Sequence, residues 1–329
     1  MTASTTLLPY LYKGSLSANA NQVIVSVARK NATELELNRS EASGFDAAYA
    51  ALSKDQDVED IFLAIGDGEQ FRQQLQQMLP EHEGGLFENV TSGSRALARF
   101  LADPKGPFKD EGNWGYWVAQ AGWGTSKGRG ETVGYDVGGW GISAGAEHKT
   151  GIGNFGASIA YLNGKDGNGD NANEVWSNQW ELGGYWRLKT GNWLAHARVS
   201  GATIKFEGSR YFMGALDGED IVKTMTADWD GTLWSASGAV SHDLRSGNFS
   251  IRPTVAVDYY KLKEDGYTET GGGDALDLTV AERNSDELAV SGTVALGLDF
   301  GGKDQYDGWY RFELEGGRRE LVGGALGVT

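Results

Sequence analysis

Hydrophobic positions along the chain follow two different periods, and the change falls near residue 110. Before that point, apolar side chains recur at helical spacing in four segments, which begin at Asn38, Asp57, Glu69 and Gly84. The last segment, Gly84–Ala102, is the longest predicted helix and carries Arg95 and Arg99 one turn apart. Two alternating segments, Leu7–Ser15 and Val23–Arg29, precede the helices and predict short strands.

After residue 110, apolar and polar residues alternate in segments of roughly ten residues, as strands with one buried face require. Val255 and Val257, for example, alternate with Ala256 and Asp258. We count nine such segments and predict an antiparallel, all-β architecture. Pro253 lies inside one of them, where it would remove a ladder hydrogen bond, so we expect a bulge or frayed end there.

Composition supports this division and limits the chemistry. The chain has 329 residues, and all 11 Trp and most of the 49 Gly lie in the second part. It has no Cys, which excludes disulfides, thiol catalysis and Cys-ligated metals. The net charge of −16 argues against a nucleic-acid partner, because nucleic acids are bound by basic surfaces.

The charged residues on the predicted strands favour a membrane barrel over a soluble all-β domain, which is the alternative. A soluble barrel would bury these charges at high cost, whereas a water-filled lumen accepts them. The predicted lumen-facing residues are Glu181, Arg187, Arg198, Arg252, Asp258, Arg311, Glu313 and Glu315. The predicted lipid-facing residues are Trp180, Trp186, Val255, Val257, Val290, Leu296 and Phe312.

The connections between predicted strands alternate in length, which is typical of an up-and-down transmembrane barrel with short periplasmic turns and long outer loops. The short connections are 149–151, 189–192, 245–248 and 301–308. The long ones are 124–136, 163–175, 207–229 and 263–286. Because bacterial barrels close with an even number of strands, we expect the final strands to be missing from this sequence.

Several short motifs occur in the order found in one known family. They are 8–13, 25–30, 77–80, 93–96, 121–124, 258–267, 285–288 and 315–318, which read LPYLYK, VSVARK, QMLP, GSRA, AGWG, DYYKLKEDGY, SDEL and EGGR. In this order the chain resembles the C-terminal region of a classical type V autotransporter of the alphaproteobacterial type. The resemblance covers nearly the whole sequence.

This resemblance implies a twelve-stranded outer-membrane barrel with a helix in its lumen, of which nine strands are present. Residues 1–37 would end a β-helical passenger, residues 38–110 would form a helical linker that includes the lumen helix 84–102, and residues 111–329 would form the barrel. The implied function is to anchor the N-terminal passenger in the outer membrane of a Gram-negative bacterium and deliver it to the cell surface. The implied partners are outer-membrane lipid, the passenger, the barrel-assembly machinery and periplasmic chaperones.

We predict no catalytic, cofactor or metal site, and therefore no enzyme. Asp166–Asp170 resembles the start of a calcium loop, but Asn171 and Ser177 stand where that loop needs Gly and Glu. For Arg95 and Arg99, docking against lumen carboxylates competes with a solvated helix face. We expect a monomer, and an outer-membrane pore, a barrel enzyme or a surface adhesin without a secretion role remain as alternatives.

Overall fold

The computed structural model describes residues 8–79, 84–102, 108–128, 134–167, 173–301 and 310–325. The N-terminal part contains β1 Tyr12–Ala18, β2 Val23–Arg29, α1 Arg39–Leu52, α2 Gln56–Ala64, α3 Gly68–Gln76, α4 Gly85–Ala98 and the 3-10 turn η2 Arg99–Ala102. The remainder consists of strands. Up to the middle of the sheet these are β3 Lys109–Glu111, β4 Trp114–Lys127, β5 Tyr135–Thr150, β6 Gly153–Gly167, β7 Asn173–Thr190, β8 Trp193–Leu216 and β9 Glu219–His242. They are followed by β10 Leu244–Ser246, β11 Phe249–Glu264, β12 Tyr267–Thr268, β13 Thr279–Val280, β14 Arg283–Phe300 and β15 Tyr310–Ala325.

Local capping fixes where the first three helices begin, and all four helices predicted from the sequence are confirmed. Asn38 and Glu41 form a capping box at the start of α1. The Asn38 side chain accepts a hydrogen bond from the Glu41 backbone N–H, and the Glu41 side chain accepts one from the Asn38 backbone N–H. Asp55 and Asp67 cap α2 and α3 by accepting backbone N–H bonds. Among the described residues, no helix is long and apolar enough to cross a membrane.

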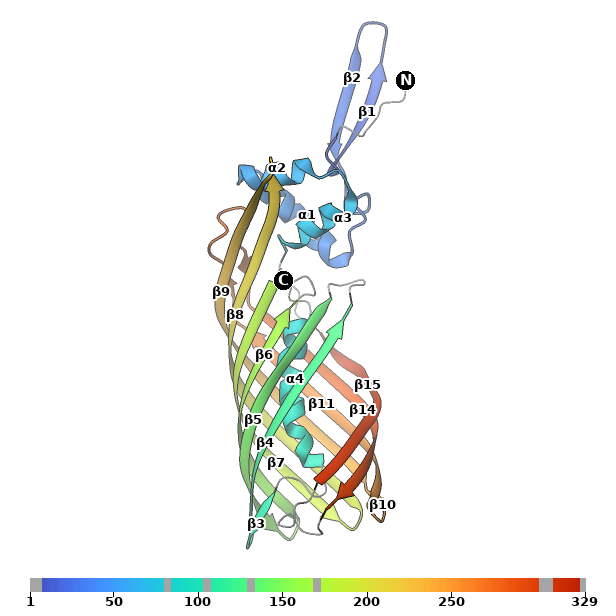
Figure 1. Ribbon diagram of the computed structural model, residues 1–329, viewed down its shortest axis with the longest axis vertical. Coiled ribbons are helices and arrows are strands. Elements are labelled where there is room, and N and C mark those ends of the chain that lie inside the picture. Colours follow the sequence, from blue (N-terminus) through green and yellow to red (C-terminus); the bar gives the residue numbers. More distant parts are fainter. Residues whose placement is uncertain are drawn as a thin grey trace.

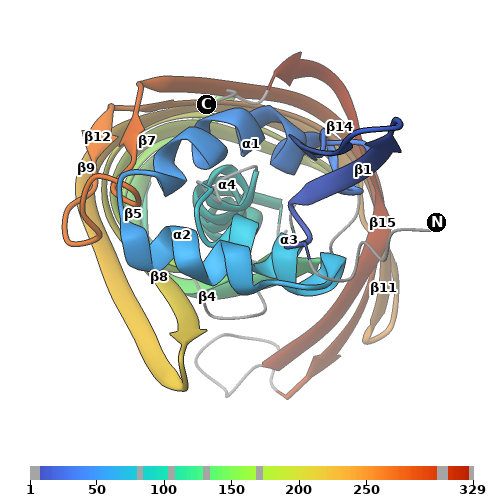
Figure 2. The same ribbon diagram turned by 90° about the horizontal axis from the view of Figure 1, so that it is seen from above.

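The long strands form one antiparallel sheet that curls around α4 (Figures 1 and 2). Each long strand pairs with its neighbour in the order β15, β14, β11, β9, β8, β7, β6, β5, β4, and the short β3 continues past β4. Tight turns join β5 to β6, β7 to β8 and β10 to β11 at one end of the sheet. In the last two, Gly191 and Gly247 have the positive φ values that such turns require. The fourth predicted turn, 301–308, lies largely outside the described residues.

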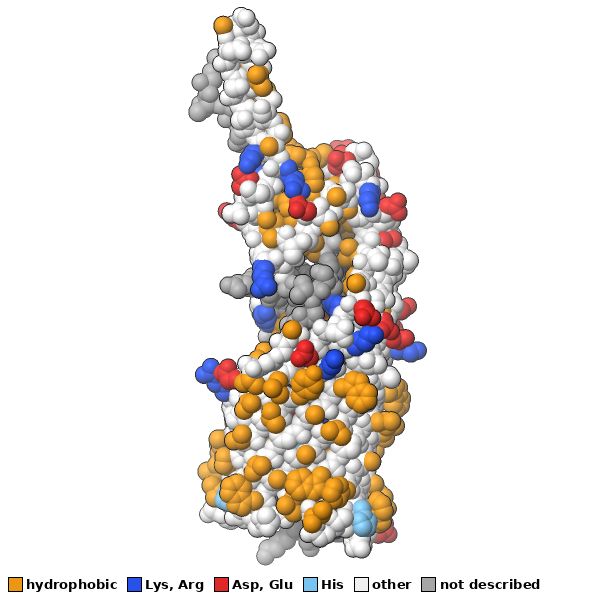
Figure 3. All heavy atoms as spheres, turned by 180° about the vertical axis from the view of Figure 1, so that it is seen from behind, with side chains coloured by type: hydrophobic (Ala, Val, Ile, Leu, Met, Phe, Trp, Pro, Cys, Tyr) orange, Lys and Arg blue, Asp and Glu red, His pale blue; other side chains and the backbone are white. Residues whose placement is uncertain are grey.

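The side chains of β11 reverse their polarity part of the way along the strand. From Phe249 to Tyr259 every second side chain is apolar and exposed, but the same face continues with Lys261 and Lys263. The opposite face changes from small and charged residues to the buried Tyr260 and Leu262. The sheet therefore has an apolar outer band at one end only, which Figure 3 shows as a belt of orange side chains below a polar region.

The expected long loop at 207–229 is wrong. Strands β8 and β9 continue as a hairpin through this segment and turn at Asp217 and Gly218, both with positive φ. Polar residues such as Glu207, Thr224 and Asp228 lie on the exposed face of the hairpin, while Phe212 and Met225 are buried on the other face. Once the outside is water, alternation with a polar exposed face is what a strand needs.

The expected irregularity near Pro253 is present. The ladder between β9 and β11 is interrupted opposite Arg252 and Pro253, and it resumes between β10 and the start of β11. Asp243 separates β9 from β10 at this point. The missing proline N–H is therefore placed where the strand pairing already pauses.

Helices α1–α3 sit on the β8–β9 hairpin at the polar end of the sheet, and the β1–β2 hairpin projects beyond them (Figure 1). Residues of the helices share one core with Phe212, Met225 and Leu276. We name residues 8–79 the cap. Helix α4 begins near the cap and runs through the curled sheet toward the end with the tight turns.

We predict that the ion pair between Asp55 of α2 and Lys223 of β9 stabilises the seat of α2. Asn caps a helix as well as Asp, so Asp55→Asn removes the charge and keeps the cap. The hydrogen bond from Lys223 lowers the pKa of the Asp55 carboxyl below its ordinary value. Its stabilisation is therefore fully present above about pH 3.9 and is lost as the pH falls through the lower, folded-state pKa.

Amide hydrogen exchange of α2 at neutral pH measures this effect. Asp55→Asn should lower the opening free energy by about 1 kcal/mol, since both partners are partly exposed. The control is Asp67→Asn, which changes the equivalent cap of α3. Equal effects of the two substitutions would contradict a specific role of the ion pair.

Candidate functional site: the interior of the curled sheet

One buried amide ties helix α4 to strands β4 and β7. Asn89 is fully buried, and its Nδ2 donates to Ser177 Oγ over 3.1 Å. Its Oδ1 accepts from Trp123 Nε1 over 3.2 Å. Asn89 thereby ties the helix to β7 and β4 at the same point, and a buried amide held in this way fixes the rotation of the helix.

Glycines allow the helix to approach the strands closely. A Cβ at Gly93 would lie 2.7 Å from Leu162 Cδ2 and 2.9 Å from Trp123 Cζ2. A Cβ at Gly164 of β6 would lie 2.4 Å from Asn89 Oδ1. Gly93, which weakens α4 as an isolated helix, therefore allows α4 to pack closely against the sheet.

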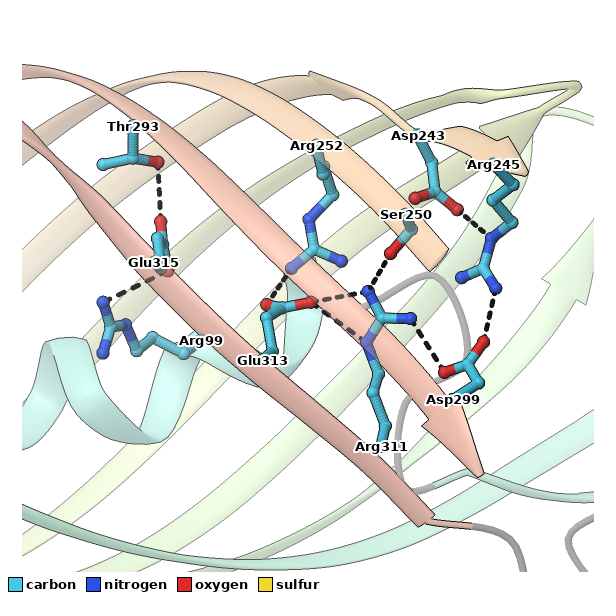
Figure 4. A network of polar contacts seen from close by, with 10 residues as sticks. All are labelled: Arg99, Asp243, Arg245, Ser250, Arg252, Thr293, Asp299, Arg311, Glu313 and Glu315. Carbon is cyan, nitrogen blue, oxygen red and sulfur yellow. Dashed lines mark hydrogen bonds and ion pairs between the residues drawn. The ribbon is translucent and has the colours of Figure 1, made fainter. Parts of the chain in front are cut away.

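A network of arginines and carboxylates extends across β10, β11, β14 and β15, as shown in Figure 4. Arg311 is central, since its guanidinium lies 2.6 Å from Glu313 and 3.1 Å from Asp299. Arg252 also pairs with Glu313, and Arg245 lies 2.7 Å from Asp299. Each of these charged side chains thus contacts an opposite charge on its own strand or on a neighbouring one, which reduces the cost of burying it.

Two further ion pairs lie deeper, on β5, β7 and β8. Arg187 makes a bidentate ion pair with the fully buried Glu147, with N–O distances of 2.5 and 2.7 Å. Glu181 pairs with Arg198, which also contacts Ser94 of α4 at 3.4 Å. The Glu181–Arg198 pair thus places charge directly beside the helix.

On its other side, α4 faces a cavity of about 660 Å³ that separates it from β11, β14 and β15. Arg95, Arg252, Asp258 and Arg319 are among the residues that line it. A cavity with this many charged groups is a hydrated space rather than a dry core. The interior is therefore asymmetric, with tight packing on one side of the helix and water on the other.

Of the two arginines predicted to dock against interior carboxylates, the structure pairs Arg99 with Glu315 at 3.2 Å. Arg95 instead lies 2.9 Å from Glu88 of its own helix. The residues predicted to face the lumen lie on the inner face with full or partial burial, except that Glu315 retains substantial exposure.

The residues predicted to face lipid are exposed on the outer face at Trp180, Val255, Val257, Val290, Leu296 and Phe312. Trp186 is half-buried, and its Nε1 donates to the backbone oxygen of Ile152. This bond ties β7 to the neighbouring β5–β6 turn.

Sequence reasoning missed Glu147 and Asn89, which are both fully buried in the interior and hydrogen-bonded there. Glu147 stands between Ala146 and His148 in a segment with little alternation, so no pattern distinguished it. Asn89 was assigned only to a helix, although a lone amide in an otherwise apolar helix face was a usable signal. No group of three or more His, Asp or Glu among the described residues could hold a metal ion.

This geometry defines a class of protein: a membrane-inserted antiparallel β-sheet that encloses a helix in a polar interior. Comparison with known proteins identifies the particular family. Residues 117–319, well over half of the chain, match the Autotransporter beta-domain family. The chain belongs to this family of outer-membrane translocators, whose barrels deliver an N-terminal passenger to the cell surface.

A solved structure and two curated proteins show similarity. The translocator domain of the autotransporter NalP from Neisseria meningitidis has a TM-score of 0.52 at 17% identity, over 74% of this chain and 83% of that chain. Esterase EstA from Pseudomonas aeruginosa is 25% identical over 128 residues, 37% of this chain. Esterase EstA from Pseudomonas putida gives the same values, and in both cases the match spans 19% of the relative's length.

We predict that Gly93→Leu displaces α4 from its seat, because the added carbons would overlap Leu162 and Trp123. Ala98→Leu is the matched control, since Ala98 lines the cavity and has room. In planar bilayers, the Gly93→Leu protein purified from outer membranes should open more often and conduct more than the control. Indistinguishable traces from the two variants would show that the glycine contact does not hold the helix.

We also predict that Arg311 and Arg99 contribute very differently to stability. Arg311→Ala should lower the unfolding free energy by roughly 2–3 kcal/mol, because it removes charged hydrogen bonds from a site where the side chain is only 5% exposed. Arg99→Ala should cost less than about 1 kcal/mol, since that side chain is 69% exposed. Urea unfolding in detergent micelles compares them, and similar costs would argue against Arg311 as the centre of the network.

Proposed function

We propose that this chain forms a closed twelve-stranded pore in its complete protein, with α4 as the segment that remains in the lumen after the passenger has crossed. The observation that supports this most directly is that α4 lies inside the curled sheet (Figures 1 and 2). In the sequence α4 is followed by β3 and β4, which begin at the end with the tight turns. A twelve-stranded barrel is wide enough for one helix, since barrels of eight strands are filled by side chains and those of sixteen leave open channels. A helix with its side chains needs about 10–12 Å.

The outer apolar band fits the hydrocarbon layer of the membrane. Phe249 and Tyr259 lie ten residues apart on one face of β11, and both are exposed. At about 3.3 Å per residue and a tilt of roughly 40°, this distance corresponds to about 25 Å along the membrane normal, the height expected for such a band. The aromatic residues at its limits, such as Trp193 and Trp234, are placed where interfacial belts occur.

Orientation follows from the two ends of the sheet. The end with the tight turns faces the periplasm, and the extended β8–β9 hairpin with the cap faces the medium. Residues 1–37 would then continue a β-helical passenger, and residues 38–110 would join it to the barrel. During assembly, the partners implied by this reading are the barrel-assembly machinery and periplasmic chaperones.

A pore without a secretion role is the second candidate. The observation that favours this second candidate is the cavity beside α4, because its charged lining suits the passage of ions. Removal of residues 84–102 distinguishes the two. In both cases that deletion should raise conductance, because α4 lies inside the sheet. In a translocator it should also lower the amount of passenger delivered to the cell surface, whereas a simple pore delivers no passenger.

Thiol labelling of intact cells tests the orientation. The chain has no Cys, so a single introduced Cys is the only reporter it contributes. An impermeant reagent should label Asp220→Cys at the tip of the β8–β9 hairpin, and it should label Ser246→Cys in the β10–β11 turn only after the outer membrane is opened. Both positions are exposed, so access alone decides the result. Labelling of Ser246→Cys but not Asp220→Cys on intact cells would reverse the orientation.

A further inference from the structure

One buried arginine joins three separate segments where the cap meets the sheet. Arg210 of β8 is 4% exposed. Its guanidinium lies 3.2 and 2.5 Å from the two carboxylate oxygens of Glu269, in the connection that follows β11. It also donates to the backbone oxygens of Gln77, at the end of α3, and Leu276. An arginine buried with all these partners fixes their relative positions, because its planar fork tolerates few other arrangements.

A reciprocal pair of amide contacts lies beside it. Gln74 Nε2 donates to the Met213 backbone oxygen at 3.1 Å, and the Met213 N–H donates to Gln77 Oε1 at 2.7 Å. The side chains of α3 thus complete the hydrogen bonding of a strand residue at the upper end of β8. These two hydrogen bonds fit only one alignment of α3 against β8.

The apolar contact at this interface is continuous with the core of the cap. Phe212 and Met225 of the hairpin are fully buried among residues of α1–α3, and Leu276 is 1% exposed. Gly214 of β8 leaves room for Ile61 of α2, since a Cβ there would lie 2.5 Å from Ile61 Cδ1. Detaching the cap would therefore expose the core on both sides of the interface.

We propose that residues 8–79 are a resident cap, held noncovalently on the outer hairpin of the translocator, and that this cap is the anchor that holds whatever precedes it at the cell surface. The chain connection through α4 is then a second, independent tether. The partner of the β8–β9 hairpin and the 267–280 connection is this segment of the same chain.

This role differs from that of a flexible linker between passenger and pore. A linker would transmit no position to the passenger, whereas a docked cap sets the direction in which the β1–β2 hairpin leaves the surface (Figure 1). Cutting the chain between the cap and α4 would release a passenger held only by its covalent connection. It would leave in place a passenger held by the cap.

The test inserts a protease site between Leu79 and Gly84 in the complete reading frame, with an epitope tag on the N-terminal side. Labelling of the tag on intact cells before cleavage shows that delivery has occurred, so a failure of the proposed secretion function is detected separately. After cleavage, cells are sedimented, and the tag is measured in pellet and supernatant. Heat-modifiable mobility on gels verifies that the sheet of each variant is folded.

The decisive variants change the interface at one glycine. Gly214→Leu would push α2 away from β8, and Gly66→Leu is the control, because Gly66 lies in the cap with open space around it. The unmodified protein and Gly66→Leu should keep the cleaved tag on the cells. Gly214→Leu should raise the released fraction by roughly tenfold, the change expected for a loss of one order of magnitude in docking equilibrium.

Arg210→Met offers a second route to the same result, and it should also raise release. Loss of the tag from cells carrying the unmodified interface would overturn the proposal without reference to any variant. Retention that is the same in Gly214→Leu, Arg210→Met and Gly66→Leu would overturn it as well, because the cap would then be held by something other than this interface.

Discussion

The structure depends on the change of solvent along the outer face of the sheet. Strand β8 shows it as β11 does, since its exposed Val199 is followed on the same face by Thr203 and Lys205. Where the outside is hydrocarbon, apolar side chains belong there, and the inside is free to carry charge. Where the outside is water, the hydrophobic effect returns the apolar side chains to the interior.

The two halves of the interior follow from this reversal. Toward the cap, Leu86 and Phe87 of α4 enter an apolar cluster with Ile204, Phe206 and other inward residues of the sheet. Further along, the same helix passes the Glu181–Arg198 pair and then the cavity with its charged lining. One helix therefore has a hydrophobic anchor at its beginning and a polar, hydrated neighbour toward its end.

Alternation in the sequence was sufficient to predict the strands, the outward apolar residues and the helices, because these depend on local periodicity. Alternation could not predict where β8 ends, because a segment rich in polar residues is equally consistent with a loop and with a strand whose outer face is in water. Arg210 was lost with that segment, although it makes the contacts that hold the cap. The partner of Arg95 is a different case: Glu88 lies seven residues earlier in α4, about two turns away on the same face, so the spacing in the sequence offered it as an alternative to the carboxylates of the sheet.

The composition of α4 makes the helix dependent on the sheet around it. Gly93 costs about 1 kcal/mol relative to Ala in a helix, and the neighbouring Thr91 and Ser92 are also weak helix formers. A helix of 14 residues is marginal in water even with a better sequence. Its stability must therefore come from its seat, where Asn89 is paired and Gly93 meets Leu162. A segment with these properties becomes helical when the sheet around it supplies that seat, so Gly93, which makes α4 a poor free helix, is also the residue that fits it closely against the sheet.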